Sequence, residues 1–227
     1  MTFDFDVITR SLPYLWQGFE YTVELTVVAA LGGLFFGTFL ALMRLSPNRF
    51  IAGPASAYVN LMRSVPLVLV LFWFFFLMPQ VLQVLTGAER PPPIGAERTA
   101  LITFVMFQAA YYCEIMRAGI QSIPKGQVYS AYALGLRYGQ AMWLVILPQA
   151  FRNMIPVLLT QTIILFQDTS LVYVISGTDF TGAASRIAQR DGRLVEMYLF
   201  VAAVYFVLCY ALSYLVKRLQ QKFAVIR

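Results

Sequence analysis

A small group of polar residues stands at the end of one long apolar run. Asp168, Thr169 and Ser170 follow 15 uncharged residues that begin after Arg152. A charge at membrane depth is costly unless it is paired or faces water, so each of these residues is a candidate for a site. One carboxylate and two hydroxyls suit an α-ammonium group. The alternative is that Asp168 caps a helix break, and a broken helix also leaves free backbone groups that bind a zwitterion.

Four further polar residues lie within or beside apolar runs. Arg63 either faces a central cavity, where a guanidinium binds a carboxylate bidentately, or sits at the interface as an ordinary cytoplasmic base. Gln161 lies seven residues before Asp168, which is two helical turns away on nearly the same face. Gln108 and Tyr111 either line a path or form hydrogen bonds between helices. With the Asp168 group, these four residues are the candidates for a substrate path.

The sequence lacks the groups that most enzymes use. It has no histidine, and its two cysteines, Cys113 and Cys209, stand alone in apolar stretches, so no zinc site or disulfide framework is expected. It also has no G-x-x-x-x-G-K-[ST] motif, so the chain does not hold ATP in a P-loop. We therefore expect no catalytic residue, no metal and no cofactor in this chain.

Composition indicates a membrane protein. The 227 residues are 59% hydrophobic and 12% charged, with a mean hydropathy of +0.69, whereas soluble domains are about 25% charged. A helix needs about 20 residues to cross the hydrocarbon core, and the charged residues leave uncharged runs close to that length. We expect an all-α polytopic membrane protein with one domain over 1–227. Its five spans are expected near 21–43, 57–80, 98–118, 150–170 and 196–216.

Small residues recur along the first expected span. They are Ala29, Gly32, Gly33, Gly37 and Ala41. Small residues at this spacing let two helix backbones approach closely. The pattern therefore predicts tight packing of the first span against another helix.

The distribution of bases predicts the orientation. Of the 17 Lys and Arg residues, 11 fall on one side of the expected spans with Glu114 as the only acid, and six fall on the other side with eight acids. Cytoplasmic loops carry the excess of bases, so we expect the N-terminus outside and the C-terminus in the cytoplasm. The net charge of +6 then reflects the orientation of the chain in the membrane, and no nucleic-acid partner is expected.

The cytoplasmic stretch over 119–149 is longer than the usual helix connection of about two to eight residues. Gln127, Ala131, Gly135 and Gly139 recur every four residues and would share one face of a helix. A face of small residues lets a short helix dock into a partner protein. The alternative is an amphipathic helix that lies on the lipid surface, and the residues alone leave both interpretations open.

This loop and its flanks carry a series of motifs. Tyr129, Ser130 and Ala131 occupy the positions of an E-A-A motif, Gly135 is its glycine, and 145–148 read V-I-L-P nine residues later. The stretch resembles the EAA loop of ABC importer permeases, although tyrosine and serine replace two of the name-giving residues. Longer stretches of this chain resemble the polar amino acid uptake branch of that family; they lie at 63–67, 114–127, 147–152 and 167–172. Two stretches resemble its glutamate/aspartate importers and lie at 164–174 and 189–197.

The resemblance implies a transport subunit. Such permeases work in pairs, as homodimers or heterodimers, with an ABC ATPase dimer that binds ATP and Mg and with a periplasmic substrate-binding protein. They lie in the bacterial inner membrane. The resemblance further implies that the helix over 127–140 inserts into the ATPase and that the D-T-S stretch lines the substrate path. The implied coupling residues are Gln127, Tyr129, Ser130, Ala131, Gly135, Leu147 and Pro148.

The implied substrate is glutamate or aspartate, with glutamine or basic amino acids as the alternative. Two other classes of protein stay open. A secondary transporter would usually have more spans and internal inverted repeats, and we see no repeat in this sequence. A membrane scaffold would have the same apolar spans without transporting a solute.

Overall fold

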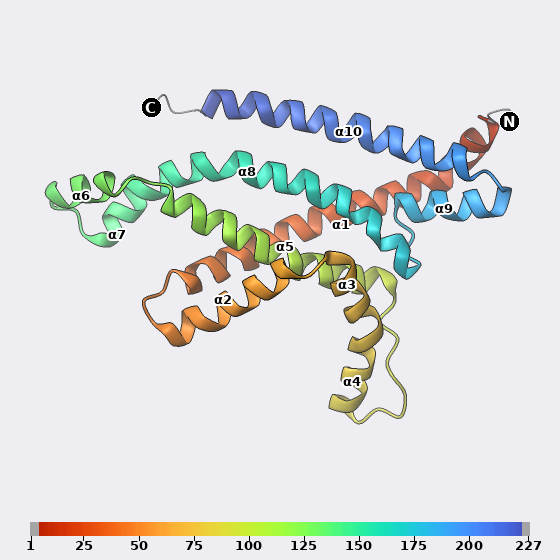
Figure 1. The fold of residues 1–227 in the computed structure, drawn as a ribbon, viewed down its shortest axis with the longest axis horizontal. Helices are drawn as coiled ribbons and strands as arrows, with labels where there is room; N and C mark the ends of the chain where they lie inside the picture. Colours follow the sequence, from red (N-terminus) through yellow and green to blue (C-terminus); the bar gives the residue numbers. More distant parts are fainter. Residues whose placement is uncertain (1–4, 224–227) are drawn as a thin grey trace.

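The computed structural model describes residues 5–223, which fold into helices joined by short connections (Figure 1). Five helical stretches are long and apolar enough to cross a membrane. They are α1 (Asp6–Arg44), Leu67–Thr86, α5 (Ala96–Gln121), Tyr138–Ile175, and α10 (Leu194–Phe223). The expectation of an all-α membrane protein with about five spans is confirmed.

A proline divides the second expected span. Val65 is extended, with φ −114° and ψ 136°, because the α conformation is disfavoured before Pro66. The expected range 57–80 therefore straddles the end of one helix and the start of the next. The elements on either side are α2 (Arg49–Ser64), α3 (Leu67–Phe72), a π-helical turn (Trp73–Leu77) and α4 (Met78–Thr86).

A second π-helical turn joins the cytoplasmic loop of the sequence analysis to the fourth long helix. It spans Met142–Ile146, between α7 (Tyr138–Ala141) and α8 (Leu147–Asp168), and it precedes Pro148. Proline lacks the N–H that would bond the carbonyl four residues earlier, and the wider π turn accommodates this loss. The chain consequently stays helical from Tyr138 to the end of α8.

The small residues of α1 pack against α5, as their spacing predicts. Ala29 and Ala41 are buried, and a Cβ added at Gly33 would lie 2.9 Å from the Cβ of Gln108 on α5. A Cβ added at Gly37 would lie 2.9 Å from the carbonyl oxygen of Ala109. The two helices can approach this closely only because α1 presents glycine at these positions.

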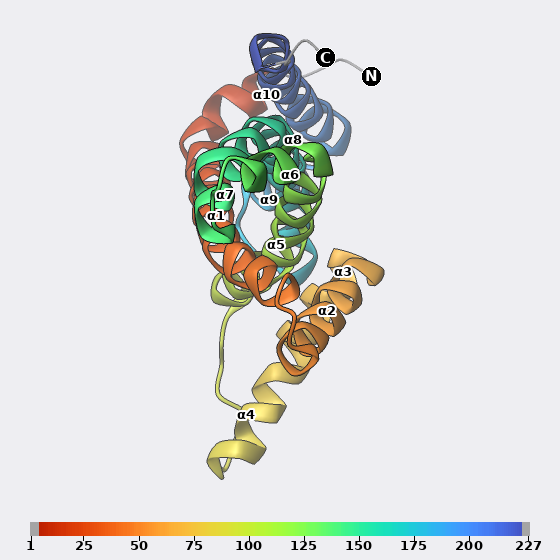
Figure 2. The ribbon, with the colours of Figure 1, turned by 90° about the vertical axis from the view of Figure 1, so that its left-hand side faces the viewer.

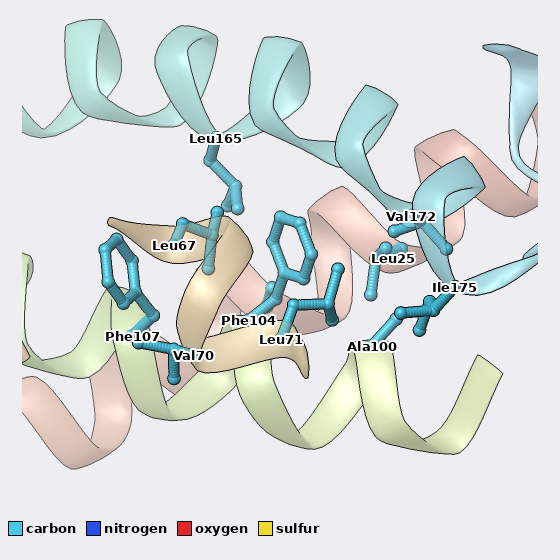
Figure 3. Close-up of a cluster of buried hydrophobic side chains, with 11 residues drawn as sticks. Leu25, Leu67, Val70, Leu71, Ala100, Phe104, Phe107, Leu165, Val172 and Ile175 are labelled. Carbon is cyan, nitrogen blue, oxygen red and sulfur yellow. The ribbon is translucent and has the colours of Figure 1, made fainter. Parts of the chain in front are cut away.

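One buried apolar cluster ties α3 to the middle of the bundle (Figure 3). Leu67 of α3, Phe104 of α5 and Leu165 of α8 meet there, and Figure 3 shows Leu67 and Phe104 lying between the α5 and α8 ribbons. Val172 belongs to the same cluster and lies in the 3-10 helix Thr169–Ile175 that continues α8. The cluster fixes α3 against the end of α8.

A second cluster gathers at the end of the bundle that carries the N-terminus. There α9 (Phe180–Asp191) packs between α1 and α10, and its Ala183, Ala184 and Ala188 are fully buried. Asp179 caps α9 by accepting hydrogen bonds from the backbone N–H groups of Thr181 and Gly182.

Beyond α3, helix α4 leaves the bundle and stands apart from it (Figure 2). Its apolar side chains are mostly uncovered: Val84 is 83% exposed and Leu85 is 76% exposed. Apolar side chains that are this exposed need lipid or another protein chain to cover them. The helices α6 (Lys125–Ala133) and α7 lie at the end of the bundle that also carries the end of α10 (Figure 1).

Candidate functional site

A network of ion pairs surrounds Glu114 near the end of α5. Arg44 Nη1 lies 2.5 Å from Glu114 Oε2, and Arg63 Nη1 lies 3.5 Å from the same oxygen. Arg117 completes the network by donating to both oxygens of the carboxylate. The network joins the ends of α1, α2 and α5 and carries three positive charges for one negative charge. Its excess positive charge suits an anion.

Arg63 also contacts Tyr111, another candidate of the sequence analysis. The Arg63 guanidinium carbon lies 5.6 Å from the centroid of the Tyr111 ring, a cation–π distance. The side chain of Arg63 is 38% exposed, whereas that of Arg44 is 12% exposed, so Arg63 keeps donors that are free for another partner. The side chain of Arg63 therefore lies against α5. Sequence reasoning missed its partner Glu114, although a single acid among 11 bases was a signal.

Gln108 and Tyr112 bury polar groups between the helices. Gln108 is 3% exposed and packs against Gly33, and its Nε2 lacks a hydrogen-bond partner within the part of the chain that the structure describes. Tyr112 Oη lies 2.6 Å from Thr162 Oγ1 on α8, in hydrogen-bonding contact. Gln108 therefore forms no hydrogen bond to another helix within the part of the chain that the structure describes, and its place on a substrate path stays a prediction. Gln161, the neighbour of Thr162, is partly buried.

The Asp168 group lies at a change of helix type. α8 ends at Asp168 and continues as the 3-10 helix, so the chain does not break there. Thr169 is buried and donates through Oγ1 to the carbonyl of Phe166 at 2.6 Å. Asp168 and Ser170 are partly buried, and neither side chain has a hydrogen-bond or ionic partner among residues 5–223. Their polar groups are available to a ligand.

The structure separates the sequence candidates into two groups. Met154 of α8 packs at Gly119 of α5, whereas Val172, beyond the end of α8, shares a cluster with Ala100 of α5. The two helices are therefore antiparallel. Asp168 lies toward the first turns of α5. Tyr111 lies near the middle of α5, against the same apolar cluster as Leu165, and Arg63 lies between Tyr111 and Glu114.

The loop helix α6 ends earlier than the spacing of its small residues predicts. Gly135 has φ +78°, its N–H donates to the carbonyl of Tyr132 at 2.9 Å, and the N–H of Leu136 donates to Ala131 at 3.1 Å. This is a Schellman motif, in which glycine supplies the left-handed residue after the helix. The prediction that Gln127, Ala131, Gly135 and Gly139 share one face of a single helix is therefore wrong, because Gly135 ends α6 and the next helix begins at Tyr138.

Aromatic side chains dominate the free surface of the loop. Tyr129 is 65% exposed and Tyr138 is 66% exposed, while Ala131 is 2% exposed and faces inward. Ser130 and Gln127 are also exposed, and the amide of Gln149 approaches Gln127 at 3.5 Å. The remaining candidates open α8 directly after its π turn: Leu147 is partly buried and Pro148 is exposed.

Comparison with known proteins defines the class of the chain. Residues 33–225 match the family described as binding-protein-dependent transport system inner membrane component. The chain belongs to this family, and it is a multi-pass permease component of a transport system.

Particular relatives narrow this assignment. The chain is 52% identical over 222 residues to the glutamate/aspartate import permease protein GltK of Escherichia coli, covering 98% of this chain and 99% of that one. It is 31% identical over 201 residues to GltJ of Escherichia coli, covering 87% and 82%. The crystal structure of an amino acid ABC transporter with histidines has a chain with a TM-score of 0.88 and 32% identity, covering 98% of this chain and 100% of that one. The MetNI methionine ABC transporter shares the fold, with a TM-score of 0.74 and 18% identity over 93% and 97% of the two chains.

Proposed function

We propose that this chain is the transmembrane permease subunit of an ATP-driven importer of glutamate and aspartate. The observation that carries the proposal is the near full-length identity of 52% to a glutamate/aspartate import permease. An ABC ATPase dimer, a second permease subunit and a periplasmic substrate-binding protein are its partners in the bacterial inner membrane. ATP and Mg belong to the ATPase, since this chain carries no P-loop motif.

The arrangement of α6 and α7 supports a coupling role for the loop. The two helices lie at the end of the bundle that carries the end of α10 (Figure 1), which the positive-inside rule places in the cytoplasm. α6 offers exposed tyrosines to a groove on the ATPase, in the way a short helix docks into a partner. Because the chain stays helical from Tyr138 through α8, a displacement of the loop moves α8 against α5, which opens the path alternately to the two sides.

The two groups of polar residues suit the two charged ends of an acidic amino acid. Asp168 has a free carboxylate for the α-ammonium group, and Ser170 offers a hydroxyl beside it. Arg63, held between Glu114 and Tyr111, presents a guanidinium to a carboxylate. The two groups lie at different depths along α5, so each contacts one charged end of the solute.

Uptake into proteoliposomes tests the proposal. The chain is reconstituted with the ATPase, the second permease subunit and the binding protein, and uptake of labelled glutamate is measured with competing aspartate, glutamine and arginine. We expect uptake that requires ATP and that aspartate inhibits more strongly than the other two. Uptake that follows an ion gradient without ATP would identify a secondary transporter, and no uptake of any amino acid would favour a scaffold.

A further inference from the structure

A groove lined by both polar and apolar side chains runs between α8 and α10, and none of the candidate residues described above lines it. Its volume is about 330 Å³. Ile163 and Val216, which join the two helices in a buried apolar cluster, form part of its wall. Its polar lining comes from Thr160, Gln167, Ser213, Lys217 and Gln220. We call this the α8–α10 groove.

The polar residues of the groove occupy one face of each helix. Thr160 and Gln167 are seven residues apart on α8, which is two turns on nearly the same side. On α10, Ser213, Lys217 and Gln220 follow at intervals of four and three residues, which also places them on one side. Ser213 lies in the apolar part of α10, whereas Lys217 and Gln220 belong to a polar helix end that also contains Arg218 and Gln221.

The groove runs from the middle of the membrane span to one end of it. Gln167 lies beside Cys209, which is near the middle of α10. Lys217 and Gln220 lie in the last two turns of the same helix. That end of α10 is the end at which α6 and α7 lie (Figure 1). In the proposed orientation, the groove therefore leads from the bilayer midplane to the cytoplasm.

The lining calls for a hydrophilic, anionic occupant. Gln167 forms a side-chain hydrogen bond with Cys209, whereas the side chains of Ser213 and Lys217 form no hydrogen bond or ion pair with a residue that the structure describes. Facing hydrocarbon, such groups would each be left unsatisfied at considerable cost. The groove contains one ammonium group and no carboxylate, so it complements a negative charge.

We propose that the α8–α10 groove is the inner half of the substrate path and receives the carboxylates of the amino acid between the midplane and the cytoplasm. The inference rests on the proposed function for its orientation and its substrate. A phospholipid phosphate has the same anionic chemistry and could reach Lys217 from the inner leaflet. Its acyl chains would then lie along Gln167 and Ser213, which favours a small solute instead.

Thiol labelling tests whether water enters the groove. In a Cys113→Ala, Cys209→Ala background, Ser213→Cys places a thiol in the groove, and Leu212→Cys places one on the neighbouring face, where Leu212 is 42% exposed. The complete transporter is treated in proteoliposomes with anionic and cationic membrane-impermeant methanethiosulfonates. We expect Ser213→Cys to react at least about tenfold faster than Leu212→Cys, to prefer the anionic reagent, and to be protected by glutamate during turnover.

Equal rates at the two positions, or reaction of Ser213→Cys only with a lipid-soluble maleimide, would overturn the inference. Glutamate uptake by the wild-type complex and by the cysteine-free background is measured first. Absence of uptake by the wild-type complex would contradict the proposed function itself. Normal uptake combined with an unreactive Ser213→Cys would contradict only the assignment of the groove.

The adjacent bases of α10 provide a matched pair for a second test. Lys217 lines the groove, whereas Arg218 stacks on Tyr214 with its guanidinium carbon 4.6 Å from the ring centroid. We expect Lys217→Gln to lower glutamate uptake about tenfold and Arg218→Gln to leave it within about twofold. The defect should be the same in vesicles of phosphatidylcholine alone and in vesicles that also contain phosphatidylglycerol. A Lys217→Gln defect confined to the phosphatidylglycerol vesicles would assign the groove to lipid and overturn the proposal.

Discussion

Arg44 and Glu114 form the closest link between α1 and α5 at their shared end, with Arg44 Nη1 2.5 Å from Glu114 Oε2. Arg44 is the last residue of α1, so the pair fixes the end of that helix. Arg63 and Arg117 share the same carboxylate, so three helix ends depend on one acid. A single side chain thus holds together the region from which the loop of α6 and α7 departs.

Loss of this carboxylate is expected to destabilise the protein. Glu114→Gln leaves three arginines close together without their counter-charge, which costs about 2 kcal/mol or more. Unfolding in detergent, followed by circular dichroism, measures the effect. Glu97→Gln is the control, because Glu97 lies on the same helix and its side chain is exposed. A Glu114→Gln melting temperature no lower than that of Glu97→Gln would show that the network contributes nothing.

Gly135→Ala is expected to weaken the C-terminal end of α6. An added Cβ at Gly135 meets no atom within 4 Å, so the cost of about 1 kcal/mol arises from the positive φ alone. Gly139→Ala is the matched control, since Gly139 lies in α7 with open space around it and alanine favours a helix. Binding of the purified permease to the ATPase is the readout. We expect weaker binding for Gly135→Ala than for Gly139→Ala, and equal binding of the two variants would contradict the role of the Schellman motif.

Tyr129→Ala is expected to weaken ATPase binding more strongly than Gly135→Ala does. A buried aromatic anchor at an interface contributes about 2 kcal/mol, which corresponds to roughly 30-fold in affinity. Tyr210→Ala removes an equally exposed tyrosine from α10 and serves as the control: Tyr129 is 65% exposed and Tyr210 is 67% exposed. If both variants bind the ATPase as the wild-type chain does, α6 does not dock through its aromatic face.

Asp179 gives a pH dependence that can be measured. Its carboxylate is fully buried at the start of α9, and burial raises its pKa from the ordinary 3.8 to about 6 despite the N–H donors of Thr181 and Gly182. The folded protein thus holds this proton more tightly than the unfolded chain. The resulting stability is fully present below about pH 3.8 and is lost as the pH rises through 6.

Asp179→Asn removes this titration and keeps an oxygen that caps α9. Relative to this variant, the wild-type melting temperature should fall between pH 4 and pH 6.5, the window that the pKa of about 6 defines, and then stay level. Thermal unfolding of both proteins across that range is the measurement. Parallel profiles for the two proteins would mean that Asp179 does not titrate in this window.

The spans could be predicted from the sequence because they depend on local composition. The packing of α1 against α5 could also be predicted, because Gly33 and Gly37 are small, whereas the role of Asp168 on a path stays a prediction. The end of α6 at Gly135 could not be told from the sequence, because the four-residue spacing of Gly135 from Ala131 is also the spacing of one helical face. A glycine at φ +78° and a glycine inside a helix look alike in sequence.

Other features depend on contacts between distant segments. The network around Glu114 brings Arg44 and Arg63 to α5, and their sequence separations of 70 and 51 residues give no sign of this meeting. The α8–α10 groove likewise requires two helices to present their polar faces to each other. Such sites follow from packing, which spacing within one helix does not reveal.

In the proposed function, this chain links an amino-acid receptor on one side of the membrane to ATP hydrolysis on the other. The most direct test measures ATP hydrolysis by the complete transporter in proteoliposomes, with glutamate-loaded binding protein added either on the side of ATP or on the opposite side. We expect hydrolysis to rise only when the loaded binding protein and ATP are on opposite sides, and unloaded binding protein to have little effect. Hydrolysis that is the same in all three conditions, or that rises only with both on one side, would show that this chain does not couple the two.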